Sequence, residues 1–262
     1  MVESRGGLKG ARMRIEHLYR YPVKGLTAEA IETTEIAPSG LFPWDRAFAL
    51  AQGDAPLDPA RPAWLAKRHF LCLMANPGAA RLRASFDPRH AVLALSGPAG
   101  GIAENPFAPA GQARLGAFLT AFLGPEARGT PRFWHIPGHV FADDARPVIS
   151  LVNLASLADL AARAGAPRHR LRFRANIYLA GAPAWAEFGW QGREIALGGA
   201  RLRVLNPIQR CPAIAVNPET AEIDTDGPQE LRRLYGHPHF GVFAEVLEGG
   251  RLALGDALEI LP

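Results

Sequence analysis

The chain has 262 residues, of which 48% are hydrophobic and 21% are charged, so it is long enough for one large or two medium globular domains. Its formal net charge of +4 comes from scattered basic residues, without the aromatic stripe or Cys/His spacing of a nucleic-acid-binding module. No apolar run approaches the roughly 18 residues of a membrane helix. We therefore expect no nucleic-acid partner and no membrane association, and the basic balance suits an anionic ligand.

Residues 1–12 are polar and glycine-rich and lack the apolar block of a secretory signal, which predicts a flexible tail. The two cysteines, Cys72 and Cys211, lie far apart in unlike contexts, so neither a disulfide framework nor a CxxC metal site is available. Both features favour a cytoplasmic location.

The first half shows short apolar segments separated by Pro and Gly, a pattern typical of strands and turns. It predicts strands at 14–21, 31–36, 46–51 and 92–95. The Pro/Gly/Ala-rich stretch 97–111 predicts an exposed connection, and helical spacing of apolar residues predicts a helix over 112–123 that stops at Gly124-Pro125.

The second half opens with a buried-strand pattern at 147–152, after which Asn153 can cap an amphipathic helix that closes near Gly165. A further helix is predicted over 228–235, ended by Gly236. The remaining predicted strands are 172–179, 193–197, 201–205, 213–216, 240–247 and 251–261.

These elements lack the βαβ alternation of Rossmann and TIM folds. They predict a mainly β protein with peripheral helices, of class α+β, with a barrel architecture. We expect an N-terminal β-rich domain over 13–145 and a second domain over 146–262.

Cys211 is the first candidate for chemistry. The adjacent Arg210 favours the thiolate form, which can bind a soft metal or act as a nucleophile. The alternative is a small buried hydrophobic residue, since free cysteine is often buried. Cys72 lies in an apolar run without a neighbouring charge, which indicates a core cysteine.

Arg174 and Asn176 alternate with apolar residues, so on a strand their side chains would share one face. A guanidinium beside an amide can bind a phosphate or a conjugated heterocycle. The alternative is a solvated face of the barrel.

Several other basic or polar residues have the same two interpretations. Lys24 lies in a Pro-containing turn in which Gly25 would leave the backbone open to a ligand, but it could equally be solvated. Arg46, Lys67 and Arg68 could bind an anion or form exposed salt bridges. Ser150, just before a capped helix, could receive an anion or form a local turn hydrogen bond.

Common catalytic and nucleotide-binding motifs are missing from the sequence. It has no HExxH, which argues against zinc hydrolase chemistry, and no GxSxG, which argues against a Ser-His-Asp hydrolase. It also has neither GxGxxG nor GxxxxGK[ST], so nucleotide binding by those loops is not supported.

Taken in order along the chain, the motifs identify a family resemblance. These motifs are Tyr21-Pro22-Val23-Lys24-Gly25, Gly40-Leu41 through Trp44-Asp45-Arg46, Lys67-Arg68, Val148-Ile149-Ser150, Ala155-Ser156-Leu157-Ala158-Asp159-Leu160, Arg172-Phe173-Arg174-Ala175-Asn176-Ile177, Arg210-Cys211, Val216-Asn217-Pro218-Glu219-Thr220 and Gly255-Asp256. With them the sequence resembles the molybdenum cofactor sulfurase C-terminal (MOSC) domain proteins that carry an N-terminal β-barrel extension, a group that includes the mitochondrial amidoxime-reducing component.

The resemblance implies a MOSC-type β-barrel packed with the N-terminal domain, and a molybdenum cofactor, a pterin dithiolene ending in a phosphate. Cys211 would be the protein ligand of the metal and the catalytic residue. The residues implied to hold the phosphate and pterin are Lys24, Arg46, Lys67, Arg68, Ser150, Arg174, Asn176, Gln209 and Arg210. The resemblance also implies two functions associated with the family, pyridoxal phosphate binding and sulfur carriage.

The chain departs from the reductase members at three positions. Gly25 and Gln209 stand where those proteins have serine, and Ala175 stands where they have proline. The missing hydroxyls remove potential hydrogen bonds to the phosphate or pterin.

Three hypotheses for function follow. The first is a molybdenum-cofactor oxidoreductase acting on small N- or S-oxygenated compounds, with electrons from a separate redox protein because the chain has no flavin, haem or iron–sulfur motif. The second is a sulfurtransferase that carries a persulfide on Cys211. The third is a molybdenum-cofactor carrier without turnover.

Overall fold

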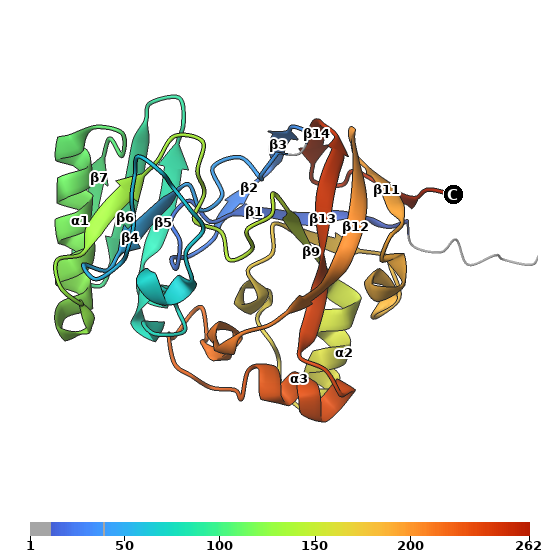
Figure 1. The fold of residues 1–262 in the computed structure, drawn as a ribbon. Coiled ribbons are helices and arrows are strands. Elements are labelled where there is room, and N and C mark those ends of the chain that lie inside the picture. The colour runs from blue at the N-terminus through green and yellow to red at the C-terminus, as the bar shows by residue number, and fades with distance from the viewer. Residues whose placement is uncertain (1–11, 39) are drawn as a thin grey trace, which may run out of the picture.

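The fold is that of a computed structural model, which describes residues 12–38 and 40–262. The tail predicted at 1–12 therefore lies outside the described residues except for Arg12. The molecule has two β-rich lobes side by side, one carrying α1 on its outer face and the other carrying α2 and α3 (Figure 1). The predicted fold class, mainly β with peripheral helices, is confirmed.

The largest sheet has the strand order β15-β11-β12-β13-β9-β10-β1-β2. Its strands are β15 (Leu258–Ile260), β11 (Glu194–Leu197), β12 (Ala200–Gln209), β13 (His239–Glu248), β9 (Ile149–Asn153), β10 (Ile177–Ala180), β1 (Arg14–Arg20) and β2 (Glu29–Ile31). Apolar side chains from these strands form one buried core, which includes Ile15, Leu151, Ile177, Leu202 and Val242. Burial of this core is the main stabilising contribution to the lobe.

The other lobe contains two small sheets and a second core. The strands are β4 (Phe48–Ala51) with β8 (Arg132–His135), and β5 (Arg83–Asp87), β6 (Val92–Gly97) and β7 (Gly100–Glu104). Helix α1 (Pro109–Leu123) begins with Pro109 and buries Leu115, Leu119 and Leu123, which recur every four residues and so lie on one face. This face packs into the core of the lobe.

The lobe that contains the largest sheet is called the barrel lobe here. Its helices α2 and α3 begin and end as the sequence predicts. Helix α2 (Leu154–Ala164) is capped by Asn153, whose side chain accepts a hydrogen bond from the Ala155 N–H, and it ends at Gly165 with φ 70°. Helix α3 (Pro228–Tyr235) ends at Gly236 with φ 77°. Among the described residues, no helix combines the length and apolar character needed to cross a membrane.

Several predicted elements are wrong. Residues 172–179 form the 3₁₀ helix η4 (Arg170–Phe173) and the strand β10 rather than one strand. Of residues 213–216, the first three belong to the 3₁₀ helix η6 (Pro212–Ala215), and Val216 forms an isolated β-bridge with Ile223. The remaining 3₁₀ helices are η1 (Lys67–His69), η2 (Pro77–Arg81), η3 (Gly124–Glu126) and η5 (Ala186–Trp190).

Other predicted strands and connections have different bounds. The exposed connection predicted at 97–111 contains β7, which pairs with β6. The predicted strand 251–261 is divided into β14 (Gly250–Ala253) and β15 by a turn at Gly255, where φ is 84°. The predicted strand 31–36 is divided between β2 and β3 (Thr33–Ile36).

The sheets connect the two halves of the sequence. Strand β1 pairs antiparallel with β10, and β3 pairs antiparallel with β14. The barrel sheet therefore contains strands from both sides of residue 145, where the sequence predicts a domain boundary. The bounds 13–145 and 146–262 stay a prediction.

Candidate functional site

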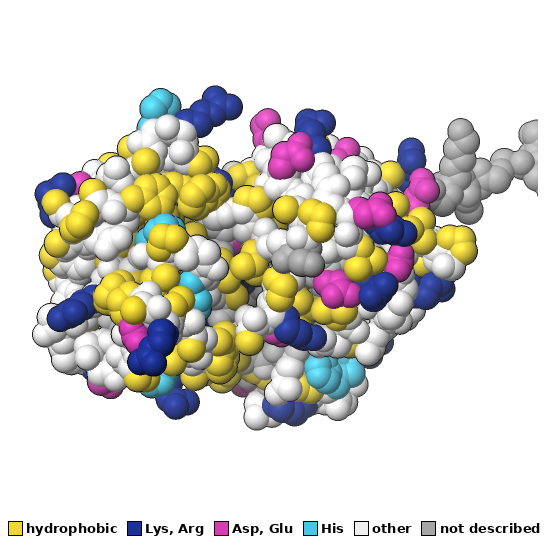
Figure 2. All heavy atoms as spheres, turned by 45° about the horizontal axis from the view of Figure 1, so that its top comes forward, with side chains coloured by type: hydrophobic (Ala, Val, Ile, Leu, Met, Phe, Trp, Pro, Cys, Tyr) yellow, Lys and Arg dark blue, Asp and Glu magenta, His cyan; other side chains and the backbone are white. Residues whose placement is uncertain are grey.

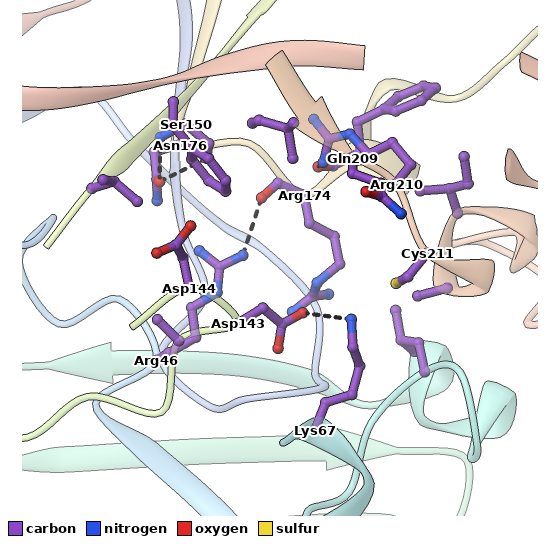
Figure 3. Close-up of a pocket in the computed structure, with 18 of the residues that line it drawn as sticks. Arg46, Lys67, Asp143, Asp144, Ser150, Arg174, Asn176, Gln209, Arg210 and Cys211 are labelled. Carbon is purple, nitrogen blue, oxygen red and sulfur yellow. Dashed lines mark hydrogen bonds and ion pairs between the residues drawn. The ribbon is translucent and has the colours of Figure 1, made fainter. Parts of the chain in front are cut away.

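A cavity of about 460 Å³ lies between the two halves of the chain. It brings together every predicted site residue except Arg68. Its lining includes Lys24, Arg46, Lys67, Ser150, Arg174, Asn176, Gln209, Arg210 and Cys211. Figure 3 labels these residues apart from Lys24. Arg68 is exposed outside the cavity, and its backbone carbonyl accepts a hydrogen bond from Arg128.

Cys211 is placed by the end of β12 and the start of η6. Its carbonyl accepts a hydrogen bond from the Ile214 N–H, 3.2 Å away, and Pro212 begins the 3₁₀ turn. The side chain is half-buried and lines the cavity. Figure 3 shows the Lys67 side chain extending toward the Cys211 sulfur.

Two lysines share one carboxylate at the floor of the site. The Lys24 ammonium is 2.5 Å from Asp143 Oδ1, and the Lys67 ammonium is 3.3 Å from Asp143 Oδ2. Partial burial acts to raise the pKa of Asp143, but the charges of Lys24 and Lys67 together outweigh it and lower that pKa. Lys24, only 4% exposed, also donates to the Phe141 carbonyl, and its burial lowers its own pKa.

Gly25 lines the cavity, and packing on its other side also requires glycine. It has φ 84°, and a Cβ atom at this position would lie 2.5 Å from the Leu71 carbonyl oxygen. A side chain at this position would therefore clash with Leu71, while the Gly25 backbone borders the cavity.

Arg46 and Arg174 lie close together although they are far apart in the sequence. Arg46 Nη2 donates to the Arg174 carbonyl at 3.1 Å, and Arg174 Nη1 donates to the Leu26 carbonyl at 2.7 Å. The Tyr21 ring lies beneath both guanidinium groups. Arg46 also pairs with Asp45.

Arg174 and Asn176 do not share the face of a strand as predicted. Arg174 has a left-handed backbone conformation at the end of η4, and Asn176 precedes β10. The side-chain oxygen of Asn176 accepts hydrogen bonds from the Ser150 hydroxyl and N–H at 2.9 and 3.2 Å. Ser150 and Asn176 thus fix each other in the wall of the cavity.

Arg210 uses its guanidinium to join backbone segments. Nη1 donates to the Phe173 carbonyl at 2.7 Å, while Nε and Nη2 donate to the Phe240 carbonyl at 2.8 and 2.5 Å. Burial lowers the pKa of Arg210 to about 10, so it stays charged at neutral pH. These bonds fix the β12 end that carries Cys211.

Cys72 is buried, as the sequence predicts, and burial raises its pKa. It nevertheless lines the same cavity as Cys211. This places a second thiol near the site, which its apolar neighbours in the sequence did not indicate.

Sequence reasoning missed the acidic residues of the site and the strand partner of Gln209. Asp143 and Asp144 line the cavity, and their adjacency in an otherwise basic chain was the available signal. His239 also lines it because β13 pairs with β12 at Gln209↔His239. No local sequence pattern predicts that pairing.

The described residues contain no group of three or more His, Cys, Asp or Glu side chains that could hold a metal ion. A metal bound at Cys211 would therefore need ligands beyond those of the described residues.

Comparison with models of known protein families shows which family the chain belongs to. The family model of the MOSC domain matches residues 137–259, and that of the MOSC N-terminal beta barrel domain matches residues 12–119. This chain belongs to the MOSC-domain proteins. The cavity is lined by residues from both matched MOSC regions, such as Lys24 and Cys211.

Curated proteins similar to this MOSC-domain chain match only part of it. Mitochondrial amidoxime reducing component 2 of Bos taurus is 30% identical over 125 residues, which are 43% of this chain and 36% of that protein. Molybdenum cofactor sulfurase of Bos taurus is 38% identical over 73 residues, which are 28% of this chain and 8% of that protein. The matched segments thus span well under half of either relative.

Among solved structures, the YuaD protein of Bacillus subtilis is similar with a TM-score of 0.45 and 15% identity, over 95% of this chain and 94% of that chain.

Proposed function

We propose that this chain binds the molybdenum cofactor in the cavity and acts as an oxidoreductase on small N- or S-oxygenated compounds. The observation that carries the proposal is a half-buried cysteine in a cavity whose basic side chains outnumber its carboxylates. The family relationship, together with relatives named for amidoxime reduction and for sulfuration of this cofactor, supports the same class.

The charge balance of the cavity fits an anionic ligand. Of its basic residues, the two lysines share Asp143, Arg46 pairs with Asp45, and Arg172 pairs with Asp224. Arg174 has no carboxylate partner among the described residues. A buried charge without a counterion is unfavourable, so a phosphate beside Arg174 would stabilise the site.

The exterior gives a contrast to this cavity. On the face drawn in Figure 2, basic and acidic side chains of the described residues lie interspersed. On the barrel, for example, Arg203 contacts both Glu194 and Glu245. At Arg174 the unpaired positive charge lies in a partly buried cavity, where a low dielectric strengthens attraction to an anion.

The donor set also fits the cofactor metal. Cys211 offers one thiolate, which suits a soft, sulfur-loaded centre whose other ligands come from the pterin dithiolene. Arg172 also lines the cavity, but its Nη atoms bind the Ile214 and Ala215 carbonyls and the Asp224 carboxylate, so it stabilises the wall.

When bound, the cofactor would supply two-electron oxygen-transfer chemistry at its metal. The chain would then have three tasks: Cys211 holds the metal, Arg46, Arg174 and Lys67 hold the anionic part, and Arg210 fixes the strand end behind the thiol. The small-molecule substrate would enter the cavity, and a separate redox protein would deliver electrons.

Metal analysis and pterin fluorescence of two cysteine variants test this proposal. Protein purified from a molybdenum-replete host is expected to contain molybdenum and pterin, and Cys211→Ala is expected to lose most of the molybdenum because its thiolate ligand is removed. Cys72→Ala is a matched control, since it removes the other thiol that lines the same cavity and should retain the metal.

Three results would contradict the proposal. Wild-type protein without molybdenum and pterin would exclude a resident cofactor. Loss of metal from Cys72→Ala but not from Cys211→Ala would show that Cys72, and not Cys211, binds the metal. A Cys211 persulfide in protein that lacks pterin, detected as an added sulfur mass, would instead support sulfur transfer.

A further inference from the structure

We propose that Tyr21 is a positioning residue whose aromatic ring holds Arg46 and Arg174 in the orientation that binds an anion. The inference rests on the anion site of the proposed function. It adds a residue that does not line the main cavity and would not itself touch the ligand.

The geometry at Tyr21 brings two cations onto one ring. The guanidinium carbon of Arg46 is 4.4 Å from the ring centroid, and that of Arg174 is 4.3 Å away. The tyrosine is completely buried. At these distances a buried cation is attracted to the electron-rich face of an aromatic ring.

The two arginines repel each other, and the ring offsets this repulsion. Burial and the positive charge of Arg46 both lower the pKa of Arg174. Arg174 lacks a carboxylate partner among the described residues, so its nearest compensation is the ring and the Leu26 carbonyl. Without the ring, electrostatics would favour separation of the two side chains.

The backbone of both arginines is also held in an uncommon conformation. Arg46 has φ 52° and Arg174 has φ 48°, in the left-handed region that residues with a side chain rarely occupy. Tyr21 is part of what maintains this arrangement, because its carbonyl accepts the Arg46 N–H at 2.7 Å and its N–H donates to Asp45 at 2.8 Å. Such strain is characteristic of ligand-binding sites.

The ring rather than the hydroxyl should be responsible. The Tyr21 hydroxyl lies 3.4 Å from the Ala175 carbonyl, a long hydrogen bond. Tyr21→Phe keeps the ring and should therefore keep anion binding. Tyr21→Met keeps an apolar side chain of similar reach but removes the π face.

Calorimetric titration of the full chain with inorganic pyrophosphate tests the inference. We expect Tyr21→Phe to bind within about twofold of wild type and Tyr21→Met to bind about tenfold more weakly, which corresponds to about 1.4 kcal/mol. Phe86→Met is the control: Phe86 is a buried ring in the other core, and no cation lies over that ring among the described residues. It should lower stability without this loss of affinity.

NMR of the wild-type chain gives a second test that does not depend on any variant folding. Protons of the Arg46 and Arg174 side chains should be shifted upfield by the ring current of Tyr21. Absence of that shift would overturn the inference, as would unchanged pyrophosphate affinity in Tyr21→Met. Failure of wild-type protein to bind pyrophosphate would instead contradict the anion site itself.

Discussion

Arg210 lies next to the proposed metal ligand, yet its guanidinium contacts backbone carbonyls rather than open space in the cavity. Its three hydrogen bonds connect the end of β12 to the carbonyls of Phe173 and Phe240. A planar guanidinium can reach two carbonyls at once, which a lysine ammonium does less well. The residue therefore supports the site from behind Cys211.

Arg210→Lys is expected to lower the free energy of unfolding by about 1–3 kcal/mol, because at least one charge-assisted hydrogen bond to a buried carbonyl is lost. Urea denaturation, with the midpoint compared at constant slope, measures this change. Arg68→Lys, at an exposed position, serves as control and should stay within about 0.5 kcal/mol. Unchanged stability with weakened pyrophosphate binding would show that Arg210 contacts the ligand instead.

At the scale of elements, the sequence predicted best where local chemistry determines structure. Asn153 and Gly165 bound α2 because an amide side chain caps the first turn and glycine accepts the left-handed end. A left-handed glycine, Gly236, likewise ends α3. The barrel core followed from short apolar strands, and its fold class was predicted correctly.

Prediction failed where distant contacts determine the backbone. Alternation of polar and apolar residues around Arg174 indicates a strand, but Arg172 binds the Ile214 and Ala215 carbonyls and the segment turns as η4. The cavity residues were predicted from motifs, whereas Asp143 was missed because its carboxylate acquires its role only beside lysines more than 70 residues earlier.

Glu187 links η5 to the start of α2 and makes this contact depend on pH. It is fully buried and accepts hydrogen bonds from the Ser156 hydroxyl and the Asn153 amide. Burial raises its pKa above the ordinary value of 4.5. The folded chain thus keeps a proton at pH values where the unfolded chain loses it, so this group's contribution to stability falls as the pH rises from 4.5 through the raised pKa.

Glu187→Gln should remove this dependence of stability on pH, since the amide stays neutral and still accepts hydrogen bonds. Urea unfolding from pH 4 to about pH 7 should show a stability loss in wild type that is smaller in the variant. The exposed Glu222→Gln variant should follow wild type. If the free energy of unfolding changed with pH equally in Glu187→Gln and wild type, the role assigned to the buried carboxyl would be refuted.

At the scale of the whole molecule, the two halves share one sheet and one cavity. Strand β1 is hydrogen-bonded to β10, and its Ile15 and Leu18 belong to the core of the barrel. The cavity takes Lys24 and Lys67 from the first half and Cys211 from the second. Formation of the site therefore depends on both halves folding together.

A fragment of residues 146–262 is expected not to unfold cooperatively by itself, because it lacks β1 and exposes the edge of β10. Co-expression with residues 1–145 should restore a single transition, measured by circular dichroism during heating. A cooperative transition in the isolated fragment would instead support an independently folding domain at the predicted boundary.

The pairing of β1 with β10 also affects how the protein is made. Ribosomes add about 5–20 residues per second, so β1 emerges many seconds before its partner, which begins at Ile177. During that interval Ile15 and Leu18 lack their final neighbours and are available to other nascent chains. Translation speed and chaperone supply should thus influence the yield of this protein, even though Ile15 and Leu18 are buried in the folded chain.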